Sequence, residues 1–146
     1  SGLRARPLWT ERYVCVDRSS RRGASATEAC SPPTLATNAL IATPSGSPTR
    51  EVFDAWFAAA GISPTVSIEV DHREALLALV DAGCGAVIVP ASVASAAGGS
   101  RRRIRPLDPP VERRIDIVFR PGASTPSAER FLELAVELSS QVDRGD

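Results

Sequence analysis

The chain has 146 residues, of which 43% are hydrophobic and 23% charged, enough for one globular domain with its own core. This composition excludes a disordered polar chain, and no run of 18 uncharged apolar residues exists that would span a membrane. Seventeen basic residues, all of them arginine, balance seventeen acidic ones. The chain as a whole therefore has no electrostatic attraction to nucleic acid or anionic lipid.

The start of the chain and its cysteines suggest a cellular setting. Because the chain begins Ser1-Gly2, we expect a processed form or a fragment of a longer protein, without a retained signal peptide. Cys15, Cys30 and Cys84 are odd in number and widely spaced, and no Cys-x-x-Cys pair occurs. A structural zinc site needs four soft ligands, so we expect no metal site. Isolated thiols in a reducing, cytoplasmic compartment are the simplest interpretation.

Short strands alternate with helices in the first two thirds of the chain. Residues 12–16 predict a strand, and the polar stretch 17–33 predicts a loop followed by a helical turn near 34–36. Three further strands are predicted from short, continuously apolar runs, the pattern of strands buried on both faces. These runs are Ala39–Thr43, Thr65–Val70 and Ala86–Val89.

Each of these three strands leads into a predicted helix. Ser47 as N-cap and Pro48 at the first helical position predict one start, and Gly61 predicts its end. Asp71 with Glu74 forms a capping-box pattern for a second helix that ends at Gly83. A small-residue helix is expected over Ala91–Ala97. The order strand–helix–strand predicts an α/β fold: a mostly parallel sheet with helices on both faces.

The last third has a different character. The run Arg101–Arg105 is interpreted as a solvated basic loop rather than a nucleic-acid contact, since no aromatic residues interleave with it. Residues 111–120 carry apolar side chains at period two and predict a strand. Thr125 and Pro126 open a final amphipathic helix, on which we expect exposed apolar residues: Phe131, Leu132 and Leu138.

A binding site is expected where parallel strands end beside helix N-termini. Three such places are the segments 44–47, 70–72 and 89–92. In the first, Ser45, Gly46 and Ser47 offer two hydroxyls and a close backbone approach to an anion. The alternative is that Ser47 only caps its helix and Gly46 only turns the chain, and both interpretations remain open at this point.

Residues able to carry out catalysis are few. The only histidine, His72, is expected in the first turn of a helix, where it would be solvated and mostly neutral. Cys84 has no basic neighbour to lower the pKa of its thiol, so a buried inert thiol is expected. No Gly-x-Ser-x-Gly motif and no phosphate-binding loop are present. We therefore expect neither an enzyme nor a cofactor.

Three segments taken together resemble a known family. Ile41–Arg50 (IATPSGSPTR), Ala60–Pro64 (AGISP) and Leu79–Pro90 (LVDAGCGAVIVP) are similar to the effector-binding domain of LysR-type transcriptional regulators, in its carboxyl-terminal part. The opening Pro7–Glu11 and the closing Arg114–Arg120 fit the same domain in the same order. The similarity covers nearly the whole chain, and the ordered set of segments carries it, since no single motif is exclusive.

The resemblance implies a periplasmic-binding-protein-like type II architecture, of which this chain would hold the second lobe, two hinge strands and the final helix. Residues 1–16 would be a hinge-crossing strand from the first lobe. Residues 17–112 would form the second lobe, and residues 113–146 a hinge strand and a helix returning to the first lobe. A solute-binding protein shares this architecture and is the alternative.

The resemblance also implies a function and partners. A small acidic effector, expected to be a carboxylate, would bind between the lobes. The implied ligand-binding residues are Ser45, Gly46, Ser47, Thr49 and Pro90. DNA would be bound only through a region absent from this chain, no membrane would be involved, and a homo-oligomer is expected.

Overall fold

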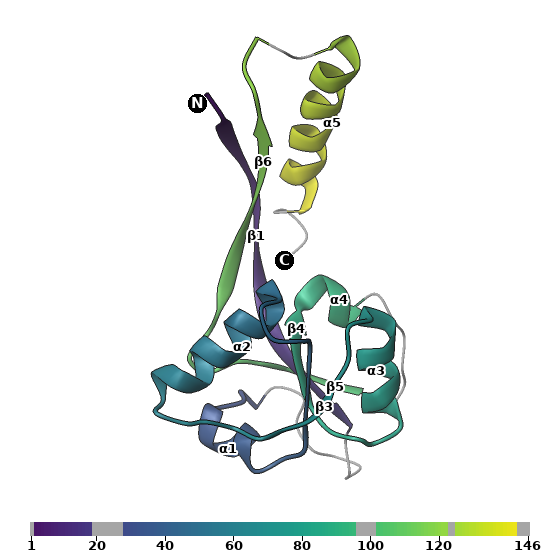
Figure 1. The fold of residues 1–146 in the computed structure, drawn as a ribbon. Helices are drawn as coiled ribbons and strands as arrows, with labels where there is room; N and C mark the ends of the chain where they lie inside the picture. The colour runs from purple at the N-terminus through teal and green to yellow at the C-terminus, as the bar shows by residue number, and fades with distance from the viewer. Residues whose placement is uncertain (1, 19–27, 96–101, 123–124, 143–146) are drawn as a thin grey trace. The chain divides into compact units, whose positions relative to one another are not determined.

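The computed structural model describes residues 2–18, 28–95, 102–122 and 125–142. Within these ranges the chain forms six strands and five helices (Figure 1). In chain order they are β1 (Arg4–Arg18), α1 (Pro32–Ala36), β2 (Leu40–Ala42), α2 (Pro48–Ala59), β3 (Val66–Glu69), α3 (Arg73–Asp81), β4 (Val87–Pro90), α4 (Ala91–Ser95), β5 (Arg102–Pro106), β6 (Glu112–Phe119) and α5 (Pro126–Val142).

These elements fall into two compact units. One unit is residues 12–111, and the other combines residues 1–11 with residues 112–146. Strand β1 belongs partly to each unit. No helix among the described residues is both long enough and apolar enough to cross a membrane.

The sheet of the larger unit is mixed rather than mostly parallel. Strands β2 and β3 are parallel neighbours, and a parallel bridge joins Leu40 to Ala86 just before β4. Strand β1, however, lies between β4 and β5 and is antiparallel to both. The expectation of parallel strands thus holds for the βαβ segment. It fails for β1 because hydrophobic patterns predict that a strand exists but carry no information about its direction.

Helices cover both faces of this sheet, as expected. Residues of β4 alternate between two apolar clusters, with Ile88 in one and Val87 and Val89 in the other. Helices α1 and α2 contribute to the first cluster, and α3 and α4 contribute to the second (Figure 1). Helix α2 contributes three buried aromatic side chains to the first cluster: Phe53, Trp56 and Phe57. Burial on both faces explains why these strands are apolar throughout.

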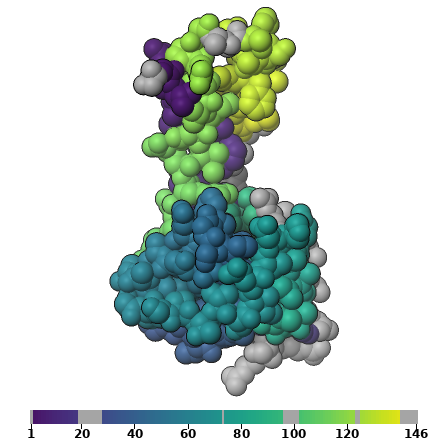
Figure 2. All heavy atoms as spheres, viewed as in Figure 1, coloured from purple at the N-terminus to yellow at the C-terminus, as the bar shows by residue number. Residues whose placement is uncertain are grey.

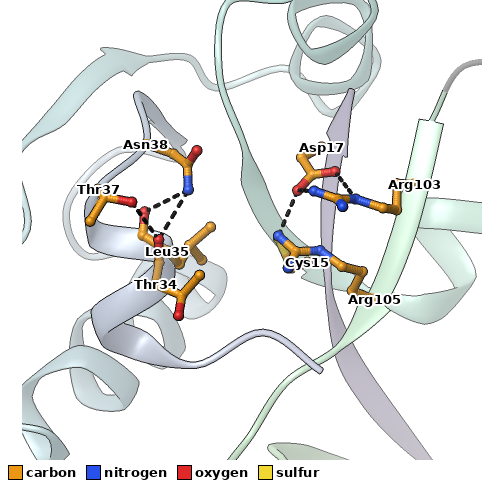
Figure 3. A network of polar contacts seen from close by, with 8 residues as sticks. All are labelled: Cys15, Asp17, Thr34, Leu35, Thr37, Asn38, Arg103 and Arg105. Atoms are coloured by element: carbon orange, nitrogen blue, oxygen red, sulfur yellow. Dashed lines mark hydrogen bonds and ion pairs between the residues drawn. The ribbon is translucent and has the colours of Figure 1, made fainter. Parts of the chain in front are cut away.

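The prediction of a solvated loop for the basic run Arg101–Arg105 is wrong, because residues 102–105 belong to a strand. Arg101 lies outside the described residues. Residues 102–106 form β5, and Arg105 is buried opposite Cys15. The carboxylate of Asp17 compensates the positive charges of Arg103 and Arg105 by accepting hydrogen bonds from both side chains (Figure 3). Because the compensating carboxylate lies more than eighty residues away in sequence, the local pattern could not reveal it.

The cap of α3 also differs from the prediction. The helix begins at Arg73 with His72 as its N-cap, and no side chain caps it. Asp71 is the residue before the N-cap. Glu74 is therefore the second helical residue and not the third, which a capping box requires. The predicted extension of α4 to Ala97 lies outside the described residues.

The smaller unit contains the amino-terminal part of β1 together with β6 and α5. Strand β6 pairs with β1, and the buried Glu11 accepts hydrogen bonds from Arg113 Nε and Nη2 at 2.9 and 2.7 Å. Of the apolar residues expected to be exposed on α5, Phe131 and Leu138 are 63% and 59% exposed, whereas Leu132 is half-buried. Figure 2 shows α5 in yellow at the surface of this unit.

Candidate functional site: the turn between β2 and α2

A tight turn joins the carboxyl end of β2 to the N-terminus of α2. The N–H of Ser47 donates to the carbonyl of Pro44 at 3.2 Å, and Gly46 between them has a φ of +84°. A positive φ at the third residue of a turn strongly favours glycine. Nothing lies within 4 Å of where a Cβ of Gly46 would be, and Ser45 and Gly46 are exposed. The turn therefore presents its backbone to the outside of its unit.

Ser47 caps α2, as predicted from the sequence. Its Oγ accepts a hydrogen bond from the N–H of Arg50 at 3.2 Å and lies 2.6 Å from Thr43 Oγ1. If Thr43 donates to Ser47, the Ser47 hydroxyl keeps its own proton for another acceptor. Thr49 is the second helical residue, so its N–H has no partner carbonyl within the helix. A hydroxyl and an N–H donor thus lie at the positive end of the helix dipole.

Arg50 is a residue of this site that the sequence reasoning missed. One of its terminal nitrogens donates to the carbonyl of Thr43 and to Glu69 Oε2, both at 3.1 Å, while its Nε donates to Asp54 at 2.9 Å. Its side chain is only 14% exposed, and the guanidinium lies 5.9 Å from the centre of the Phe53 ring. The four-residue spacing could have indicated the pair with Asp54. No local signal points to Glu69, which lies on β3.

The carboxyl end of β3 lies beside this turn. The N–H of Val70 donates to the carbonyl of Ala42 at 3.0 Å, which holds the two strand ends together. Asp71 and His72, which follow, are exposed. Pro90 differs from the other predicted site residues, since it is buried within β4 opposite Tyr13. The structure therefore groups Ser45, Gly46, Ser47 and Thr49 at the start of one helix and places Pro90, which is buried, at the carboxyl end of β4.

All three cysteines are free thiols, and two of them lie in the same apolar cluster. Cys15 and Cys30 are fully buried in one apolar cluster and form a hydrogen bond with each other. This hydrogen bond lowers the pKa of the Cys30 thiol and raises that of Cys15. Cys84 packs against the other cluster but is only half-buried, whereas a buried thiol was predicted. Among the described residues, no group of three or more metal-binding side chains occurs.

The fold defines a class of protein, since solved structures match it over almost the whole chain. The regulatory domain of CcmR from Synechocystis PCC6803, solved in complex with 2-PG, has a TM-score of 0.81 and 20% identity over 94% of this chain and 67% of that one. The effector binding domain of QuiR in complex with shikimate has a TM-score of 0.73 and 19% identity over 95% and 66% of the two chains. Such similarity establishes the periplasmic-binding-protein-like type II fold of effector-binding domains.

CbnR, a LysR family transcriptional regulator, is similar at 28% identity and a TM-score of 0.73, over 94% of this chain and 48% of its own. This chain thus spans only about half to two thirds of the structures it matches. The family model of the LysR substrate binding domain matches residues 1–140. The chain therefore belongs to the LysR substrate-binding domain family, a family of regulator domains and not of enzymes. Comparison with curated protein sequences finds no match.

Proposed function

We propose that this chain is the effector-sensing part of a bacterial LysR-type transcriptional regulator. In this proposal a small acidic metabolite binds between the two lobes of the complete domain. Ser45, Gly46, Ser47 and Thr49 hold its anionic group, and Pro90 shapes the neighbouring strand end. The family match supports a regulator over an exported solute-binding protein of the same architecture. Regulators of this family act on DNA, so we propose a cytoplasmic location.

The observation that carries the proposal is the geometry of the turn. An exposed glycine with positive φ, a serine hydroxyl and the free N–H of Thr49 meet at a helix N-terminus, an arrangement that favours anions. The structures solved with 2-PG and with shikimate, a carboxylate, support a small-molecule effector of this kind. Binding would shift the population of two arrangements of the regulator and so change how it contacts DNA. A CbnR structure has been solved as the full-length protein with its target DNA.

Calorimetry of the complete regulator against a panel of small carboxylates, shikimate included, tests this function. We expect at least one member of the panel to bind, and we expect its decarboxylated analogue not to bind. Binding by neutral analogues alone would contradict the proposal. Reading the parent gene upstream of this segment separates the alternatives, because a regulator requires a helix-turn-helix region there and a solute-binding protein requires an export signal.

Ser47→Ala should weaken effector binding about tenfold, because it removes one hydrogen bond to a charged group. It should also destabilise α2 by about 1 kcal/mol through loss of the cap. Thr125→Ala is the matched control, since Thr125 Oγ1 accepts from the N–H of Ala128 at the start of α5. That control should lose similar stability and keep its affinity. If both variants bind equally well in calorimetry, Ser47 does not contact the effector.

Glu69→Gln should strengthen binding of an anionic effector. The change removes a negative charge near the turn and releases Arg50 from one of its two carboxylate partners. Because the Glu69 side chain is 50% exposed, the gain should be modest, about two- to fivefold in Kd. Glu133→Gln on α5 is the control, because it removes a negative charge that is distant in sequence from the turn, and it should leave the Kd unchanged. Weaker binding by the Glu69 variant would show that its carboxylate contacts the effector directly.

We further propose that the chain forms a homo-oligomer through α5. Phe131, Leu134 and Leu138 lie on one face of this helix at 63%, 39% and 59% exposure. Replacing Phe131 and Leu138 together by glutamate should shift the molecular mass measured by light scattering toward that of the monomer. Glu133→Lys reverses a charge on the other side of the same helix, where Glu133 is 63% exposed, and should not change the mass. A wild-type chain that is strictly monomeric would contradict the proposal.

A further inference from the structure

Cys15 and Cys30 place two sulfur atoms together inside the larger unit. Both residues are 0% exposed, neither is in a disulfide, and their side chains are joined by a hydrogen bond. Nothing in the proposed effector site uses them, because they lie in the apolar cluster beneath α1 and α2. A buried pair of free thiols is a preorganised pair of soft ligands for a metal ion.

The two cysteines flank the same chain segment on opposite edges. Cys15 on β1 pairs with Arg105 of β5. On the other edge, Cys30 bridges to Leu107, its N–H donates to the Pro106 carbonyl at 2.8 Å, and its carbonyl accepts from the Asp108 N–H at 2.9 Å. The two residues are two strand spacings apart, and their partners Arg105 and Leu107 lie two residues apart along the segment, so their Cα atoms are separated by at least about 9–10 Å. A disulfide tolerates no more than about 7 Å, so a direct S–S bond would require the strands to move. A metal ion bound between the two sulfurs would not require the strands to move.

The charges around the pair favour an anionic complex. Asp17 is the shared acceptor of Arg103 and Arg105, so two positive charges face one negative charge (Figure 3). The Arg105 side chain is 6% exposed and reaches within 4.0 Å of Cys15 Sγ, and its Nε has no acceptor among the described residues. Counting only the part of the chain that the structure describes, one positive charge beside the sulfurs therefore has no compensating carboxylate. Two neutral thiols leave it uncompensated, whereas a dithiolate holding one monovalent cation carries a single negative charge and compensates it.

We propose that Cys15 and Cys30 form a two-coordinate site for a soft monovalent cation, Cu(I). Binding displaces both thiol protons: Cu⁺ and two thiols give an anionic S–Cu–S unit and two H⁺. No oxidant or reductant is involved. Thiolate ligands select Cu(I) over hard cations, and the described residues offer no third ligand that would complete a tetrahedral zinc site. This inference is independent of the proposed effector site.

The test uses the full chain with Cys84→Ser, which removes the only other thiol. The reduced protein is titrated with Cu(I) under argon against the chelator bathocuproine disulfonate. We expect one equivalent of Cu(I) to be taken from the chelator, and we expect X-ray absorption to show two sulfur neighbours in a linear arrangement. Adding Cys15→Ser or Cys30→Ser should abolish this uptake. Ag(I), which has the same charge and also prefers two sulfur ligands, should compete for the same site.

Several results would overturn the proposal. These are no uptake by the Cys84→Ser protein, a three- or four-coordinate copper centre, or nitrogen or oxygen neighbours of the metal. The absorption measurement needs no change to the pair itself, so it remains decisive if the serine variants fail to fold. Formation of a Cys15–Cys30 disulfide when the folded protein is treated with peroxide would also overturn the proposal. It would show that the two Cα atoms are close enough for a direct S–S bond.

Discussion

Gly85→Ala should destabilise the chain by about 3 kcal/mol, because the new methyl group has no room. A Cβ on this residue would overlap the carbonyl oxygen of Ala39 and would lie 2.9 Å from its carbonyl carbon. That carbonyl accepts from the N–H of Ala86 at 2.9 Å, and the carbonyl of Ala86 accepts from the N–H of Ile41. The substitution therefore pushes β2 away from β4 at the centre of the larger unit.

Gly46→Ala is the matched control for this prediction. An added Cβ at Gly46 meets nothing within 4 Å, so only the strain of its positive φ remains, about 1–2 kcal/mol. Urea unfolding of both variants measures the difference. A loss at Gly85 no larger than the loss at Gly46 would show that β2 and β4 are not in close contact at Ala39.

Asp17→Asn should destabilise the chain by about 3 kcal/mol, since it leaves two arginines beside the core without their shared partner. The Asp17 side chain is 13% exposed and that of Arg105 is 6% exposed. Glu133→Gln breaks a pair whose two side chains are more than 60% exposed, and it should cost no more than about 0.5 kcal/mol. Equal losses in denaturant unfolding would mean that Arg103 and Arg105 do not depend on Asp17.

The same carboxylate should make stability sensitive to acid. Burial alone would raise the pKa of Asp17, but the hydrogen bond from Arg103 and the charges of both arginines outweigh burial and lower it. A lowered folded pKa means that the stabilisation is fully present above the unfolded value of about 3.9 and is lost as the pH falls through the lower folded value. Asp17→Asn should therefore flatten the decrease of stability below about pH 4.

Local sequence signals were sufficient for the elements of the βαβ segment. Ser47 followed by Pro48 placed the start of α2 correctly, and Gly61 and Gly83 followed the helices they were predicted to end. These signals act through neighbouring backbone groups, so one stretch of sequence contains them in full. The turn at Ser45–Ser47 was predicted for the same reason.

Features that depend on partners distant in sequence could not be predicted. The arginines of β5 resemble a loop until Asp17 is placed beside them, and Arg50 resembles a surface residue until Glu69 reaches it from β3. The contact between Cys15 and Cys30 likewise needs β5 between the two segments. In each case the role of the residue depends on a contact with a residue distant in sequence, and the local sequence suggests a simpler role.

Backbone amide chemical shifts of the complete regulator, titrated with its tightest-binding carboxylate, test the central claim most directly. If the β2–α2 turn holds the anionic group, the N–H signals of Gly46, Ser47 and Thr49 should shift most, with the large downfield change of a new charged acceptor at Thr49. If the chemical shift changes reach saturation only in other segments and these three signals do not move, the β2–α2 turn does not hold the anionic group.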